Sequence, residues 1–180
     1  MTSYTEMAGY SGIQKLFHWV IAIIVIAMLG LSFFLDDVPE IYKYQAFLIH
    51  KSLGISVLFL MILRFILLIV LGRPNLPTQI SAWEFTLSRI VQYGFYILLI
   101  VMAIVGWIMS VAAGKTPTFF GLFSLPLPIE PNKALSQLMF QFHQKIAFIL
   151  IVLIILHVLG ALKHHFIDKD NVLNHMLPKR

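Results

Sequence analysis

Long apolar runs divide the chain into four segments. The runs cover residues 16–35, 46–71, 90–114 and 146–162. Each reaches or approaches the roughly 20 residues that a helix needs to cross a bilayer, once flanking residues are counted. A chain in lipid must satisfy its backbone hydrogen bonds internally, and strand-like alternation is absent, so the runs predict helices.

The predicted fold class is therefore all-α, a four-helix transmembrane bundle formed by one domain over residues 1–180. The expected spans are residues 13–35, 46–71, 89–113 and 141–165. Residues 116–129 are also apolar, but their three prolines and short length favour an interfacial loop over a fifth span. The first run could be a cleaved signal peptide, but it is long and no small-x-small site follows it, so we expect a retained helix.

The composition agrees with a membrane protein. Of the 180 residues, 59% are hydrophobic and 12% charged, against about 45–50% and 25% in soluble domains. The mean hydropathy of +0.89 excludes soluble, disordered and nucleic-acid-binding classes despite the net charge of +5. With no cysteine, the chain has no disulfide, iron–sulfur cluster or covalently attached haem.

The basic residues predict the orientation. Four spans place both termini on one side, and that side would carry eight of the 13 lysines and arginines. Because cytoplasmic loops are enriched in lysine and arginine, both termini are expected in the cytoplasm.

Four of the seven histidines lie in or at the ends of the apolar runs, namely His18, His50, His143 and His157. His143 and His157 are 14 residues apart, so they share one helix face at a separation of about 21 Å. His157 therefore matches His18 in depth near the cytoplasmic surface, and His143 matches His50 near the outer surface. Two pairs follow, His18 with His157 and His50 with His143. Any one histidine taken alone could equally be a structural residue that bonds a neighbouring carbonyl.

Each of these histidines has a small residue four positions later. These are Ala22, Gly54, Ala147 and Ala161. Positions i and i+4 lie on one helix face, so a flat ligand beside each imidazole would find room there. Ordinary packing between membrane helices would also explain small residues.

Two histidines at each depth suit haem better than zinc. A zinc site takes three or four protein ligands, whereas haem iron needs only two axial imidazoles. We therefore predict two non-covalent haem b groups, each with bis-histidine ligation, that pass single electrons. Methionine is a weaker axial alternative at positions 28, 61, 102 and 109. A metal transporter is disfavoured because transport sites lie near the midplane on broken helices.

Three basic residues accompany the histidines. Arg64 is 14 residues after His50 and could neutralise a haem propionate or simply reach the helix end. Lys51 and Lys145 adjoin the outer histidines and could attract an anionic reductant, or could extend to the membrane surface.

Three stretches carry a resemblance to a known family. They read LFHWVIAIIVIA, LIHKSLGISVLFLMILR and FHQKIAFILIVLIILHVLGALKHHFIDKDNVLNHMLP. They closely resemble the bacterial cytochrome b561 family over nearly the whole chain, with all four histidines included. The resemblance implies a four-helix bundle of the bacterial inner membrane, with haem b axial ligands at His18, His50, His143 and His157.

The resemblance also implies electron exchange with the quinone pool. Part of the family is described as superoxide:ubiquinone oxidoreductase, so this chain is expected to be an oxidoreductase that takes electrons from superoxide at the periplasmic haem. His164 is the first candidate for a quinone contact, with Arg64 and His165 behind it. The alternative for the tail is a basic end that contacts anionic lipid head groups. The alternative function is a cytochrome b subunit that relays electrons between a partner dehydrogenase or hydrogenase and quinone.

Overall fold

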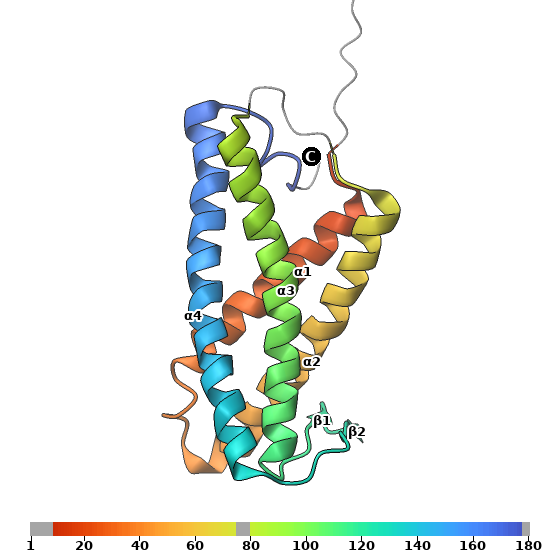
Figure 1. Ribbon diagram of the computed structural model, residues 1–180, viewed down its shortest axis with the longest axis vertical. Helices are drawn as coiled ribbons and strands as arrows, with labels where there is room; N and C mark the ends of the chain where they lie inside the picture. The colour runs from red at the N-terminus through yellow and green to blue at the C-terminus, as the bar shows by residue number, and fades with distance from the viewer. Residues whose placement is uncertain (1–8, 75–79, 178–180) are drawn as a thin grey trace, which may run out of the picture.

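Four long helices make up the bundle in the computed structural model, which describes residues 9–74 and 80–177. They are α1 (Gly12–Ser32), α2 (Glu40–Leu71), α3 (Ala82–Ala112) and α4 (Lys133–Lys163). Successive helices run in opposite directions, so the start of α1 and the end of α4 lie at the same end of the bundle (Figure 1). We call this end the termini side and the opposite end the loop side.

All four helices are long and apolar enough to cross a membrane. Many large apolar side chains on them are exposed, among them Ile23, Ile97 and Phe148. An apolar surface of this kind is stable against lipid tails but not against water. The chain is therefore a multi-pass membrane protein, and the predicted helical bundle is confirmed.

The helix boundaries differ from the predicted spans. Helices α2, α3 and α4 begin six to eight residues earlier than expected, and α1 ends at Ser32 instead of residue 35. Side-chain caps fix two of the early starts: Ser81 and Glu84 form a capping box before α3, and the Asn132 side chain accepts from the backbone N–H of Leu135 at the start of α4. Helix α2 instead begins after Pro39 without a side-chain cap. Apolar length sets the part of a helix within the membrane, whereas the caps set where the helix begins.

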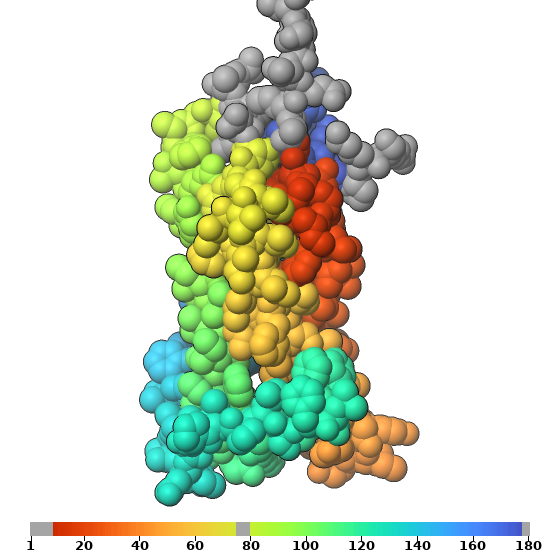
Figure 2. Space-filling model, turned by 90° about the vertical axis from the view of Figure 1, so that its right-hand side faces the viewer, coloured from red at the N-terminus to blue at the C-terminus, as the bar shows by residue number. Residues whose placement is uncertain are grey.

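The segment after α3 is a loop, as predicted. It contains one short hairpin, in which β1 (Thr118–Phe119) pairs antiparallel with β2 (Phe123–Ser124). The hydroxyl of Ser52 on α2 is fully buried and accepts from the backbone N–H of Phe120 at 2.9 Å. In Figure 2 the segment between α3 and α4 lies across the loop side of the molecule.

The buried core draws on all four helices. Its members are Ile21, Val25, Val57, Met61, Leu99, Val105, Ile146 and Leu150. Helix α2 packs against α1 and α3, and α4 packs against α3. Within residues 9–74 and 80–177, α4 forms no extended backbone interface with α1 or α2. The region between α4 on one side and α1 and α2 on the other is therefore open to side chains that extend from these helices.

Candidate haem-binding site

The structure brings His18 and His157 together at the termini side. Their ring centroids are 6.1 Å apart, with an angle of 65° between the ring planes. The Trp19 ring lies edge-on to His18 at 5.2 Å, and the Phe95 ring lies edge-on to His157 at 5.5 Å. The pair thus links α1 to α4 and is flanked by aromatic rings from α1 and α3.

The second predicted pair, His50 and His143, meets towards the loop side. The ring centroids are 6.3 Å apart and the planes are inclined by 64°. Both rings are partly buried, on α2 and α4 respectively. The two pairs therefore have nearly the same geometry, although they join different helices to α4.

The centroid separations fit an iron held between two imidazoles. A metal–imidazole bond is about 2.0 Å long and the ring centre is roughly 1.1 Å from its nitrogen, so two axial rings should be about 6.2 Å apart. The observed 6.1 and 6.3 Å agree with this value.

A cavity of about 390 Å³ adjoins the loop-side pair. His50, His143, Gly54 and Ala147 all line it, so two of the four small residues do provide space beside a histidine. Most of the remaining lining is apolar and includes Met28, Met102 and Met109. Met61 instead belongs to the buried core. An apolar slot with two imidazoles in its wall suits a porphyrin macrocycle.

His143 shows which ring nitrogen would face a metal. Its Nδ1 is buried and has no hydrogen-bond partner among the described residues, and the backbone of Met102 on α3 lies near the ring. A Cβ built on Gly106 of α3 would lie 3.0 Å from Cε1 and 3.3 Å from Nδ1 of His143. Nδ1 thus faces the α3 backbone, and Nε2 is the nitrogen available as a ligand. A ligating histidine commonly directs its other nitrogen at a carbonyl in this way.

The basic residues divide between the two ends. Arg64 lies over the Tyr96 ring at 5.8 Å and is near enough to act electrostatically on both His18 and His157. Lys51 lines the loop-side cavity, and its Nζ donates to the Lys115 carbonyl at 3.5 Å. Lys145 is exposed. Arg64 and Lys51 therefore lie at the ends where a propionate and an anionic reductant were predicted.

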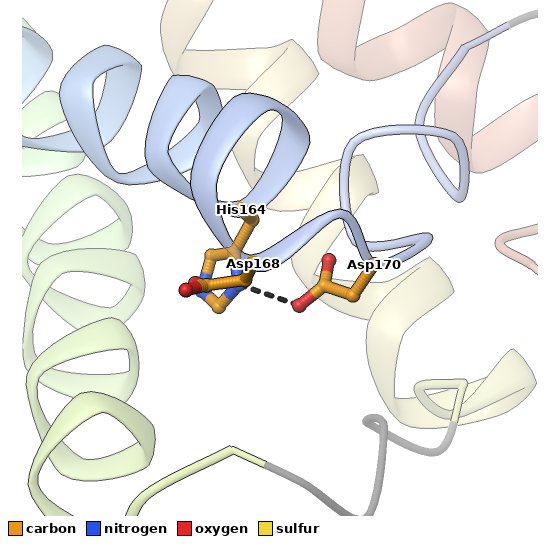
Figure 3. Close-up of side chains that lie close together, drawn as sticks. All are labelled: His164, Asp168 and Asp170. Atoms are coloured by element: carbon orange, nitrogen blue, oxygen red, sulfur yellow. Dashed lines mark hydrogen bonds and ion pairs between the residues drawn. The ribbon is translucent and has the colours of Figure 1, made fainter.

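His164, the predicted quinone contact, lies in a polar network that the sequence did not predict. It opens the π-helix η1 (His164–Asp168), and its Nδ1 is 2.7 Å from Asp170 and 3.2 Å from Asp168 (Figure 3). Only 16% of its side chain is exposed. His164 is thus paired with carboxylates, whereas the neighbouring His165 is exposed and stacks edge-on against Phe166.

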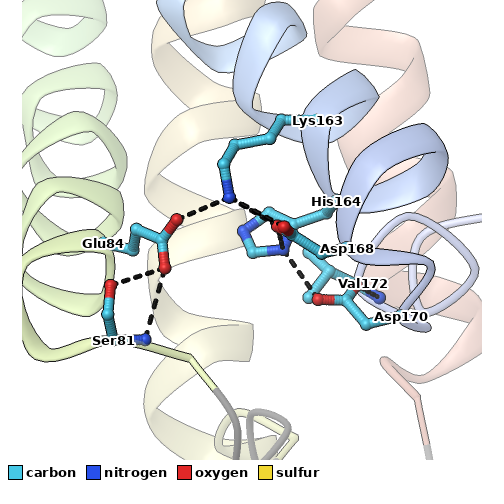
Figure 4. A network of polar contacts seen from close by, with 7 residues as sticks. All are labelled: Ser81, Glu84, Lys163, His164, Asp168, Asp170 and Val172. Atoms are coloured by element: carbon cyan, nitrogen blue, oxygen red, sulfur yellow. Dashed lines mark hydrogen bonds and ion pairs between the residues drawn. The ribbon is translucent and has the colours of Figure 1, made fainter.

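Lys163 connects this cluster to α3. Its ammonium group contacts Glu84 at 2.6 Å and Asp168 at 2.7 Å (Figure 4). His164, Asp168 and Asp170 have the donor atoms to hold a metal ion. However, the adjacent ammonium group already supplies positive charge to Asp168, so we regard the cluster as a clamp between α3, α4 and the C-terminal segment.

Sequence reasoning did not identify Gly106, Ser52 or this polar network. The Ser81-x-x-Glu84 spacing is a recognisable capping box, so the start of α3 could have been predicted from the sequence. The contact of Gly106 with His143 carries no local signal, because it depends on how closely α3 approaches α4.

Known proteins resemble this chain over almost its whole length. The family model described as "Prokaryotic cytochrome b561" matches residues 9–179. The chain is 31% identical over 172 residues to "Cytochrome b561 homolog 2" of Escherichia coli K12, covering 94% of this chain and 92% of that protein. It is 29% identical over 171 residues to "Probable superoxide oxidase CybB" of Yersinia pestis, covering 95% and 97%. "Cytochrome b561 homolog 1" of E. coli K12 is 30% identical over 131 residues, or 73% and 74% of the two chains.

Proposed function

Because the chain belongs to the prokaryotic cytochrome b561 family, which implies haem b binding, we propose that it holds two haem b groups and carries electrons across the membrane to ubiquinone. His18 and His157 would ligate one iron, and His50 and His143 the other. The centroid separations of 6.1 and 6.3 Å are the observation that carries this assignment.

The chain's own residues would position each group. Haem iron accepts and donates single electrons, and two imidazole ligands leave it without an open position for oxygen. Gly106 leaves room for the His143 ring against α3, with Nδ1 on that side, so that Nε2 would be the ligand atom. Arg64 provides positive charge beside the His18–His157 pair, where it would offset a propionate.

The proposed donor is superoxide and the proposed orientation has both termini in the cytoplasm. Two superoxide ions would each lose one electron to become two O₂, and ubiquinone would take two electrons and two protons to become ubiquinol. Lys51 at the loop-side cavity supports an anionic donor there, as does the name of the Yersinia pestis relative. His164 is the proposed quinone contact, since its Nε2 makes no hydrogen bond to the described residues.

The haem content of paired variants tests the ligand assignment. Wild-type protein should contain two haem b per chain by pyridine haemochrome assay. His18→Ala, His157→Ala and the double variant of both should each retain one, because the second substitution removes a ligand from a site already lost. His18→Ala combined with His143→Ala should retain none. One haem in this cross-pair variant, or none in the same-pair variant, would contradict the pairing.

Stopped-flow kinetics test the reaction. The purified chain alone should be reduced by superoxide and reoxidised by a soluble ubiquinone analogue. Lys51→Gln should slow reduction by superoxide and leave reoxidation unchanged, with exposed Lys133→Gln as the control for the loss of one lysine charge. If the purified chain reacts with neither compound until a partner dehydrogenase or hydrogenase is added, it is a subunit of a larger complex and our proposal is wrong.

A further inference from the structure

Three arginines gather at the termini side, between α2 and α3. They are Arg64 on α2, Arg73 just after α2, and Arg89 on α3, and all three are half-buried. Arg73 lies over the Tyr93 ring at 4.8 Å and donates to the Tyr93 hydroxyl at 3.4 Å. Arg89 and Tyr93 are four residues apart and so share one face of α3. This face is the one that Arg73 covers. Arg64 lies over the Tyr96 ring at 5.8 Å, and Tyr96 is three residues beyond Tyr93 on the same face of α3.

Tyr10, just before α1, adds a half-buried hydroxyl near these arginines. Arg64, Arg73 and Arg89 each act electrostatically on its hydroxyl. Burial is the largest influence on this group and raises the pKa of the Tyr10 phenol, despite the three positive charges. Tyr10 therefore remains a neutral hydroxyl near pH 7 and can donate a hydrogen bond to an anion.

These arginines have no carboxylate partner among residues 9–74 and 80–177. The ion pairs in this part of the chain involve Lys43, Lys163 and His164. The termini-side carboxylates are therefore already engaged by Lys163 and His164. Charges that lose water without gaining a partner cost free energy, and three like charges near one another add repulsion. An anion with several acceptor oxygens would offset both costs.

We propose that Arg73 and Arg89, with Tyr10, bind the phosphate of an anionic phospholipid at the termini side. Guanidinium groups match phosphate oxygens with paired hydrogen bonds. Apolar side chains of α2 and α3 are exposed close by in sequence, with Ile69 at 67% and Ile90 at 61%. They offer a surface for acyl chains that a free phosphate ion would not use. The site is independent of the number of haems and of the electron donor.

Lipid binding can be measured on the whole protein in membrane-like particles. The haem-loaded chain is placed in nanodiscs of phosphatidylcholine, with or without phosphatidylglycerol, and its unfolding temperature is recorded. Phosphatidylglycerol should raise this temperature for the wild type, and Arg73→Gln/Arg89→Gln should abolish most of the rise. Native mass spectrometry should show that phosphatidylglycerol binding weakens more than about tenfold, because each hydrogen bond to a charged group contributes about that factor.

The controls separate the site from general charge effects. Lys115→Gln/Lys133→Gln removes two positive charges at the loop side and should keep the wild-type response. Glu6→Gln tests whether a carboxylate of the chain itself is the anion that the arginines bind. The proposal is wrong if, in nanodiscs without phosphatidylglycerol, Glu6→Gln lowers the unfolding temperature as much as Arg73→Gln/Arg89→Gln does. It is also wrong if inorganic phosphate in neutral detergent reproduces the full stabilisation, or if the loop-side control loses the response as well.

Discussion

Gly106→Ala should selectively disturb the loop-side pair. Gly106 lies within α3, six residues before the helix ends at Ala112, where alanine normally stabilises a helix by about 0.5–1 kcal/mol over glycine. Here the added methyl group would lie 3.0 Å from Cε1 of His143, whereas ordinary van der Waals contact begins at 3.4 Å. The ring or the helix must therefore move by about 0.4 Å, which exceeds the tolerance of roughly 0.2 Å for a metal–ligand distance.

The expected result is a loss of the loop-side haem, or a shift in its reduction potential, while the termini-side haem is unchanged. Pyridine haemochrome content and a spectroelectrochemical titration of the reduced absorption bands report the two sites separately. Gly160→Ala in α4 is the matched control, because no atom lies within 4 Å of its added Cβ. This control should keep both haems and unfold at a slightly higher temperature.

The reasoning fails if Gly106→Ala behaves like Gly160→Ala, with two haems, unchanged potentials and a higher unfolding temperature. That outcome would mean that His143 is not held between Gly106 and an iron. A loss of both haems would equally contradict the site-specific mechanism, because the clash involves only His143.

Three further perturbations test the packing around the site. Ser52→Ala leaves the N–H of Phe120 without its acceptor and should lower the unfolding free energy by about 1–3 kcal/mol in chemical unfolding. Ser56→Ala removes only a bond to the Ser52 carbonyl within α2 and should lower it by less than about 1 kcal/mol. Equal losses would show that the hairpin is not anchored at Ser52. Gly54→Leu should fill the cavity and reduce haem content to about one per chain, and two retained haems would contradict a ligand in that cavity. Glu84→Gln should lower the unfolding free energy only slightly, because Lys163 is partly exposed and keeps Asp168. Lys163→Gln should lower it more, since it removes the ammonium partner of both Glu84 and Asp168, and the reverse order would refute the clamp.

The polar ends of the helices show where sequence reasoning reached its limit. The early start of α3 depends on Ser81 and Glu84, which are polar and lie outside the apolar run used to identify the span. The cluster around His164 depends on a π-helical turn and on Lys169 in a left-handed conformation, which bring Asp170 back to the histidine. Neither the turn nor its partner on α3 follows from the spacing of residues along the tail.

The four spans and the depths of the histidines follow from the chain alone, because an α-helix rises by a constant amount per residue and the bilayer requires a minimum apolar length. Those two quantities place His143 and His157 on one face of α4 before any packing is known. The side chains that hold each ring depend on how closely neighbouring helices approach. Gly106 lies against His143 because α3 and α4 pack together, and Ser52 meets Phe120 because the hairpin lies across α2. Such contacts join residues far apart in the chain, so only the tertiary structure could reveal them.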